Sequence, residues 1–246
     1  MAKIPKRPED IFNEFRGDYT ALFGDDLLAI ILYGSGARGE YVPKKSDINF
    51  LIVLTDNGME HLGDAMNLVA KWQKRRIPVP LFLTRSTIES SLDAFPLEFF
   101  NIRSAYQVIH GEDLLKDLPI KKEDLRLQCE REIKAKLLLL RESYLQAHGE
   151  VRQLRELINQ SLPAFIAIFK ALLYLKGQEI PERHEGVITD SAESFGLDRK
   201  LFQTLWHIKR AEEKPGKDEF KRIVWNYISE IKGLSKQVDQ MDIKIN

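Results

Sequence analysis

The sequences LLAIILYGSGARGE (27–40) and SDINFLIVL (46–54) decide how this chain folds. Each contains a short apolar run, LLAIILY (27–33) and INFLIVL (48–54), which is typical of a strand buried within a sheet. GSG (34–36) ends the first run abruptly, because glycine lets the backbone turn sharply. We therefore expect two buried strands, with polar residues gathered where the first ends and the second begins.

These polar residues form a pattern that is typical of a phosphate and metal site. Gly34 lets the backbone approach an anion closely, and the amides that open a short helix after it can hold phosphate oxygens together with the Ser35 hydroxyl. Asp47 and Asn49 are two positions apart on a strand, so their side chains point the same way. Paired carboxylates at these positions would hold Mg²⁺ against the phosphates for an in-line displacement at phosphorus.

The stretch resembles the signature of the polymerase-β-like nucleotidyltransferase superfamily. That signature is an apolar strand, Gly-Ser or Gly-Gly, a short spacer, and Asp-x-Asp or Asp-x-Glu in the next strand. The resemblance covers residues 8–118 in element order. The helical second half is similar to small bacterial two-domain members, such as kanamycin nucleotidyltransferase-like enzymes and the minimal nucleotidyltransferases paired with HEPN proteins.

The resemblance implies transfer of a nucleoside monophosphate from a nucleoside triphosphate to an acceptor hydroxyl, with Mg²⁺ as cofactor. The acceptor, a small molecule or a protein, cannot be read from the sequence. The implied site residues are Asp47 as the catalytic residue and metal ligand, Asn49 as a weaker metal candidate, and Gly34, Ser35 and Arg38 as the nucleotide-binding residues.

The chain departs from the signature at two of the three carboxylates. Asn49 offers a neutral carbonyl oxygen where the family has an acid, and the strand expected over 78–84 has no acid near Leu81, where the third carboxylate should lie. Asp47 alone would hold Mg²⁺ weakly. We therefore expect weak or lost catalysis, unless Asp56, Glu40 or Glu98 completes the site.

Several readings stay open at this point. The chain is either a nucleotidyltransferase with a depleted metal site, or a non-catalytic nucleotide-binding or protein-interaction module that keeps the fold. Asp47 could instead cap the backbone at the start of its strand. Arg38 could contact a triphosphate, pair with Glu40, or contact the second domain.

The remaining elements follow from apolar periodicity. In the first half, we expect helices over 8–23 and 59–74 and strands over 78–84 and 106–110. Two prolines in 78–84 cannot donate to a neighbouring strand, which favours a place at the sheet edge. Strand patterns then vanish, and the helices expected after Pro119 cover 121–148, 151–177, 194–209 and 218–238.

The fold class is therefore α+β. It consists of a nucleotidyltransferase-like mixed sheet with helices over residues 1–118, and an all-helical bundle over residues 119–246. The long helix over 121–148 and the apolar helix over 161–176 could pack within the chain or across a homodimer.

The composition excludes a disordered chain, a collagen-like chain and a small disulfide-stabilised scaffold. The 246 residues are 43% hydrophobic and 30% charged, which are globular values. One cysteine allows no internal disulfide, and neither a signal peptide nor a membrane-spanning stretch is apparent, so we expect a cytoplasmic protein. Lys plus Arg equal Asp plus Glu at 37 each, and the first 120 residues balance at −3. This balance argues against a nucleic-acid partner, although it does not exclude a local basic groove.

Overall fold

The computed structural model describes residues 4–242, which form two compact units. The first unit ends at Ile120 and the second begins at Lys121. The first contains a mixed four-stranded sheet in the order β3-β2-β1-β4, in which β1 is antiparallel to β2 and β4, and β2 is parallel to β3. The strands are β1 Leu27–Tyr33, β2 Asn49–Leu54, β3 Leu81–Thr84 and β4 Tyr106–Gly111.

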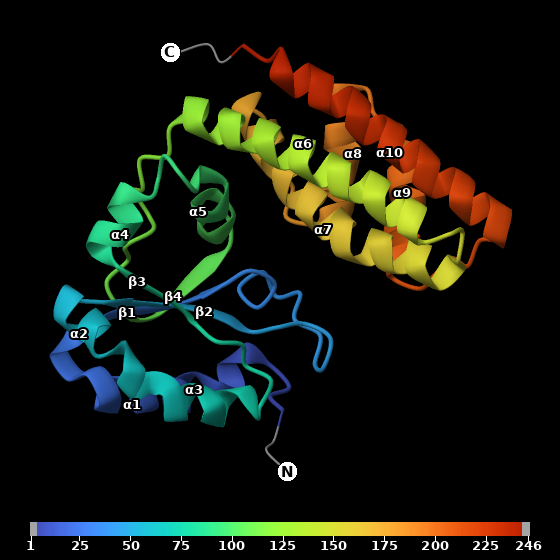
Figure 1. Cartoon of the computed structure of the whole chain (residues 1–246). Coiled ribbons are helices and arrows are strands. Elements are labelled where there is room, and N and C mark those ends of the chain that lie inside the picture. The colour runs from blue at the N-terminus through green and yellow to red at the C-terminus, as the bar shows by residue number, and fades with distance from the viewer. Residues whose placement is uncertain (1–3, 243–246) are drawn as a thin grey trace. The chain divides into compact units, whose positions relative to one another are not determined.

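Helices cover both faces of this sheet. Figure 1 shows α1 and α3 on one face, and α4 and α5 on the other. The helices and 3₁₀ turns of the first unit are η1 Pro8–Ile11, α1 Phe12–Phe23, η2 Gly24–Asp26, α2 Asp56–Glu60, η3 Leu62–Ala65, α3 Met66–Gln73, α4 Arg85–Ser90 and α5 Pro96–Arg103.

The second unit consists of helices throughout its described part. They are α6 Lys122–Gln146, α7 Val151–Leu175, α8 His184–Phe195, α9 Arg199–Lys209 and α10 Lys217–Asp239. The α+β class predicted from the sequence, a mixed sheet followed by helices, is thereby confirmed.

Two elements differ from the sequence prediction. The helix expected over 59–74 is divided into α2, η3 and α3, because Gly63 and its neighbours favour a 3₁₀ turn over a continuous helix. The helix α8 was not predicted apart from its last two residues, Ser194 and Phe195, since Gly186 and Gly196 interrupt the apolar pattern that would have revealed it.

The apolar helix α7 contacts α6, α8, α9 and α10. Among the described residues it is the one helix that is long and apolar enough to cross a membrane, but 61% of its most apolar window is buried inside the structure. This burial is what a core helix requires, and length and composition alone are weak evidence for a membrane span.

An aromatic cluster fills the core between the sheet and helices α1 and α3. The Phe15 ring of α1 stacks on Phe50 of β2 with centroids 4.0 Å apart, and it lies 4.7 Å from Tyr19 and 5.0 Å from Trp72. All four side chains are fully buried. This packing holds β2 against α1, and the start of β2 carries the candidate site.

We expect Phe15→Ala to lower the free energy of unfolding by about 3–5 kcal/mol, because it removes a buried ring and leaves a cavity among three other rings. Urea unfolding followed by circular dichroism measures the change. The matched control is Phe95→Ala, since Phe95 is 54% exposed and should shift stability by less than about 0.5 kcal/mol. Equal losses of stability in the two variants would show that this aromatic cluster contributes no more to the free energy of unfolding than an exposed ring does.

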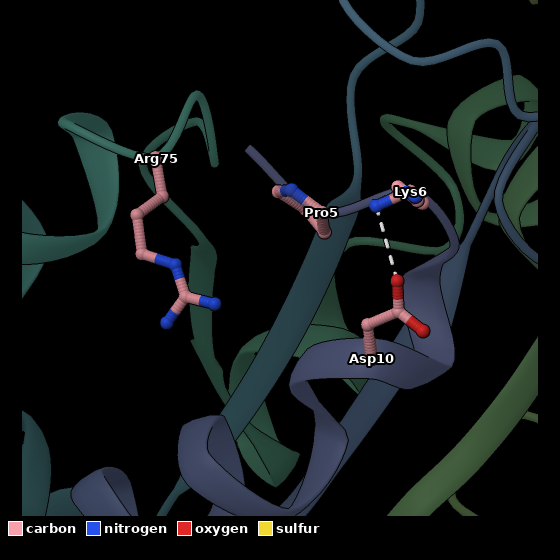
Figure 2. A pocket seen from close by; sticks show the side chains of 4 residues that line it. All are labelled: Pro5, Lys6, Asp10 and Arg75. Atoms are coloured by element: carbon pink, nitrogen blue, oxygen red, sulfur yellow. Dashed lines mark hydrogen bonds between the residues drawn. The ribbon is translucent and has the colours of Figure 1, made fainter. Parts of the chain in front are cut away.

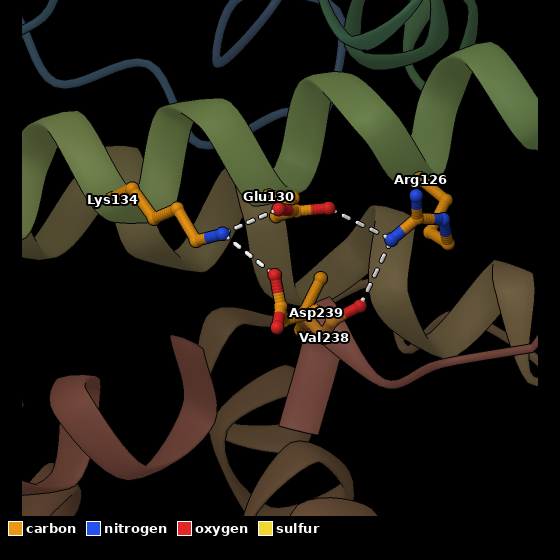
Figure 3. Close-up of polar contacts among 5 residues, drawn as sticks. All are labelled: Arg126, Glu130, Lys134, Val238 and Asp239. Atoms are coloured by element: carbon orange, nitrogen blue, oxygen red, sulfur yellow. Dashed lines mark hydrogen bonds and ion pairs between the residues drawn. The ribbon is translucent and has the colours of Figure 1, made fainter. Parts of the chain in front are cut away.

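A polar network joins α6 and α10, the first and last helices of the second unit in sequence (Figure 3). Arg126 donates to Glu130 at 2.9 Å and to the carbonyl of Val238 at 3.1 Å. Lys134 donates to Glu130 at 2.5 Å and to Asp239 at 2.7 Å. The last turn of α10 is therefore tied to the middle of α6 by charged hydrogen bonds.

This network should make stability depend on acid pH. The hydrogen bond from Lys134 holds the pKa of Asp239 below its ordinary value, so this carboxylate stabilises the fold above its unfolded pKa of about 3.9 and stops doing so as pH falls through the lower folded pKa. We expect Asp239→Asn to lower the melting temperature at pH 7, with the difference shrinking as pH falls below the unfolded pKa of about 3.9 and vanishing below the lowered folded pKa of Asp239. Asp93→Asn, at an exposed position with no ion pair to residues 4–242, is the control. A difference that persists at low pH would contradict the electrostatic origin.

Candidate functional site

The candidate site lies where β1 ends and β2 begins. The antiparallel register pairs Tyr33 with Asn49, so the chain leaves β1 next to the point at which the other candidate segment enters β2. Gly34 has φ +76°, and a Cβ added there would lie 3.5 Å from Nδ2 of Asn49. A larger side chain would strain the backbone and crowd the amide of Asn49, so this turn favours glycine.

The loop after Gly34 is a run of turns over 34–39, so the prediction of a short helix after Ser35 is wrong. The Gly34 carbonyl accepts from the amides of Ala37 and Arg38, both at 3.1 Å, which is one helical turn. The turn does not propagate because Gly39, at φ +72°, leaves the helical conformation.

Hydrogen-bond donors remain unused in this loop. Within residues 4–242, the amides of Ser35 and Gly36 and the hydroxyl of Ser35 donate to no other group. Backbone amides rarely stay without a partner, so water or an anion is the natural acceptor here. The attraction comes from these local donors, because a single turn lacks the dipole of a full helix.

Arg38 pairs with Glu40 in this structure. Its Nε lies 3.0 Å from Oε2 of Glu40, and both side chains are partly buried. Of the three partners weighed from the sequence, the structure realises Glu40. The ion pair neutralises both charges next to the turn. Because the Glu40 carboxylate is engaged by Arg38, it is not free to bind a metal ion in this structure.

Asp47 follows a compact loop closed by Ser46. The amide of Val42 donates to Oγ of Ser46 at 3.0 Å, and the amide of Ser46 donates back to the Val42 carbonyl at 2.8 Å. Asp47 itself is exposed, with no hydrogen bond or ion pair to any residue within 4–242. Burial raises the pKa of Tyr41, and the negative charges of Asp10 and Asp47 raise it further. Sequence reasoning missed the role of Ser46, although serine is among the residues that favour turns.

The strand that should supply the third carboxylate presents apolar side chains instead. The parallel register pairs Leu51 with Leu81, so Val79 is the residue that comes next to Asn49 when the register is extended by two positions. Val79 is 57% exposed and Leu81 is 38% exposed. From the sequence we expected the third carboxylate position near Leu81. The strand register instead places Val79 opposite Asn49.

The other acids considered from the sequence do not gather around Asp47. Asp56 begins α2 beyond the far end of β2, which at about 3.3 Å per residue is a full strand length away, and it accepts from Ser86 at 3.4 Å. Glu98 is exposed in the first turn of α5. Among the described residues, no three His, Cys, Asp or Glu side chains lie close enough together to hold a metal ion.

The residues therefore do not fit the Mg²⁺ that the resemblance implies. Asp47 supplies one exposed carboxylate, Asn49 a neutral amide, and Val79 and Leu81 supply no oxygen ligand. Mg²⁺ needs several anionic oxygens in a strict geometry. What the site offers is a set of neutral donors on one side and a single carboxylate on the other.

Of the comparisons with known proteins, the one with solved structures supports the fold of the chain. No protein-family model matches the sequence, and no curated protein matches it. Among solved structures, the chain is similar to the crystal structure of spectinomycin adenyltransferase AAD(9) from Enterococcus faecialis with ATP and spectinomycin. The TM-score is 0.50 at 14% sequence identity, over 92% of this chain and 99% of that chain. At this identity the similarity establishes a nucleotidyltransferase-like fold for the chain.

Proposed function

We propose that the first unit binds the phosphates of a nucleoside triphosphate at the Gly34–Ser35 turn, and that nucleotidyl transfer is weak or absent. The observation that carries the proposal is the donor set: unused amides and a hydroxyl at the turn, with Asp47 as the neighbouring carboxylate that has no ion pair within residues 4–242, while Glu40 is paired with Arg38. Such donors stabilise bound phosphate oxygens without needing a metal ion. The similar adenyltransferase was solved with ATP, which supports a nucleotide as the ligand.

Weak transfer follows from the charges. Phosphoryl transfer depends on positive charge aimed at the oxygens of the transferring group, and a metal ion held by carboxylates supplies most of it in enzymes of this kind. Asp47 alone cannot fix that charge in place. The Ser35 hydroxyl and the amides bind the ground state and the transition state about equally, so they favour binding over turnover.

A second candidate is an active nucleotidyltransferase whose acceptor is a small molecule or a protein. It is favoured by the similar structure, which holds both ATP and spectinomycin and is covered over 99% of its length. In this reading an acid outside the Gly34–Asp47 region completes the site when substrates bind.

We expect wild-type protein to bind ATP in isothermal titration calorimetry, with and without Mg²⁺. Ser35→Ala should weaken binding by about ten- to a hundredfold, because hydrogen bonds to charged groups contribute about 1.5–3 kcal/mol. Gly34→Val should abolish it through backbone strain and contact with Asn49. The matched control is Ser90→Ala, since Ser90 is exposed on α4 and should bind like wild type. The absence of any nucleotide or polyphosphate binding by wild type would refute the proposal.

Release of pyrophosphate, measured across candidate acceptors, separates the two candidates. The proposal expects little or no turnover in the wild-type protein. Robust Mg²⁺-dependent transfer that Asp47→Ala abolishes would establish the second candidate instead.

Restoring the missing charges should create a metal site. We expect Asn49→Asp combined with Val79→Asp to bind Mg²⁺ about tenfold or more tightly than wild type, because the number of anionic ligands governs affinity. The variant should also melt at a lower temperature without Mg²⁺, since three like charges repel one another, and recover when Mg²⁺ is added.

The matched control adds the same two charges elsewhere, by Asn13→Asp and Met66→Asp at exposed helix positions. Leu81→Asp in place of Val79→Asp tests the register. If the control gains Mg²⁺ affinity to the same extent, the effect is one of net charge and the proposed carboxylate positions are wrong.

A further inference from the structure

The charges of the first unit are distributed unevenly. Its first 120 residues hold 14 basic and 17 acidic side chains, so the net charge of the unit does not attract polyanions. The fold nevertheless brings together cations from three separate segments. We call this group the basic face, and it consists of Lys6, Lys44, Lys45, Lys74 and Arg76.

Specific hydrogen bonds hold these three segments in place. Arg76, just beyond the end of α3, donates from Nη1 to the carbonyl of Lys44 at 2.8 Å. The hydroxyl of Tyr41 donates to the carbonyl of Pro5 at 3.1 Å. The N-terminal segment that carries Lys6 is thus tied to the loop that leads to Lys44 and Lys45.

The cations of the basic face are exposed and unneutralised. Each is solvent-exposed, and none forms an ion pair with a residue within 4–242. Neighbouring cations behave differently: Arg75 pairs with Glu14 at 2.5 Å, and Lys71 pairs with Asp18 at 2.6 Å. The fold therefore neutralises some of the cations at the end of α3 and leaves the charges of Lys74 and Arg76 available.

A cavity of about 460 Å³ opens beside the basic face (Figure 2). It is lined by Pro5, Lys6, Asp10 and Arg75. Asp10 does not oppose an anion strongly, because its carboxylate accepts from the amides of Lys6 and Arg7, both at 3.0 Å. The hydrogen bond from the Arg7 amide is the largest influence that lowers the pKa of Asp10, so this carboxylate stays ionised and its charge is partly offset by the two amide donors.

We propose that the basic face binds the phosphate backbone of a single-stranded nucleic acid. Its cations lie on three segments, and a flexible strand can follow all three and place a phosphate at the cavity next to Lys6. A single triphosphate would engage only part of this set. Backbone binding of this kind depends on charge and needs no sequence-specific recognition.

A membrane surface fits these residues less well. Peripheral membrane binding combines cations with apolar side chains that enter the bilayer. Trp72 and Ile77 next to the basic face are buried, and the exposed apolar side chains nearest to it in sequence are Val42 and Val79. Neither is one of the Trp, Phe or Leu side chains with which interfacial helices enter a bilayer. The basic face shares no residue with the Gly34–Ser35 turn, although Lys44 and Lys45 belong to the loop that precedes Asp47.

Fluorescence anisotropy with labelled single-stranded RNA and DNA of about 20 nucleotides tests the proposal on the full chain. At physiological salt we expect dissociation constants of about 10⁻⁴–10⁻⁶ M, with tighter binding at lower salt. Replacing Lys44, Lys45, Lys74 and Arg76 by Gln should weaken binding at least tenfold. It should also flatten the dependence of log K on log salt by about 3, since each cation that neutralises a phosphate of a single strand adds about 0.7 to the slope.

The matched control removes four exposed cations of the second unit, by changing Arg199, Lys200, Lys232 and Lys236 to Gln, and should bind within about twofold of wild type. Lys45→Gln with Lys74→Gln is the second test variant. Neither side chain forms a hydrogen bond or an ion pair with a residue within 4–242, so this variant keeps the fold and should show about half of the change in slope.

Three outcomes would overturn the proposal. They are the absence of binding by wild type, an equal weakening in the control variant, and tighter binding to phosphatidylserine vesicles than to either nucleic acid. Equal affinity for RNA and DNA would support recognition of the phosphate backbone alone, and a preference for RNA would identify the ribose hydroxyl as an added point of recognition.

Discussion

The antiparallel pairing of β1 with β2 is the constraint on which the rest of the first unit depends. The pair Tyr33 and Asn49 closes the ladder, so whatever leaves β1 and whatever enters β2 must meet at one end of the sheet. The stacking of Phe15 on Phe50 then fixes β2 against α1. A slip of one residue would turn Phe50 away from this core. The position of the candidate site is therefore secured by apolar packing and needs no ligand.

That security explains how the site can lose charge and keep its shape. Asn49 begins the interior strand β2, while Leu81 begins the edge strand β3 and Val79 precedes it, and substitution of these two residues costs the core little because both are already partly exposed. Carboxylates that hold a metal repel one another when the metal is absent. Replacing them by neutral groups relieves that repulsion and leaves the donors at the Ser35 turn intact. In the proposed function, phosphate binding and catalysis would therefore rest on different residues.

Features that depend on neighbouring residues in the sequence could be predicted, and features that depend on contacts formed only in the folded chain could not. The strands over 27–33 and 48–54 were evident because burial on both faces leaves an almost wholly apolar run. The short helices α4 and α5 were not, since elements of six to eight residues show too little periodicity. The shift from Leu81 to Val79 required the parallel register, and the pairing of Arg38 with Glu40 required the folded loop. The helix expected after Ser35 failed at Gly39, whose positive φ is not visible in the sequence.

The distribution of charge in the first unit also could not be predicted from its composition. An averaged balance of −3 hides the basic face because ion pairs such as Arg75 with Glu14 consume some cations and leave others available. The N-terminal segment contacts both regions that we propose as anion sites. Pro8 packs against Gly36, where an added Cβ would lie 3.5 Å from its ring, while Lys6 lies two residues earlier at the basic face. Displacing this segment would therefore perturb the Gly34–Ser35 turn and the basic face together. The stretch from Lys6 to Pro8 thus couples the positions of the two regions.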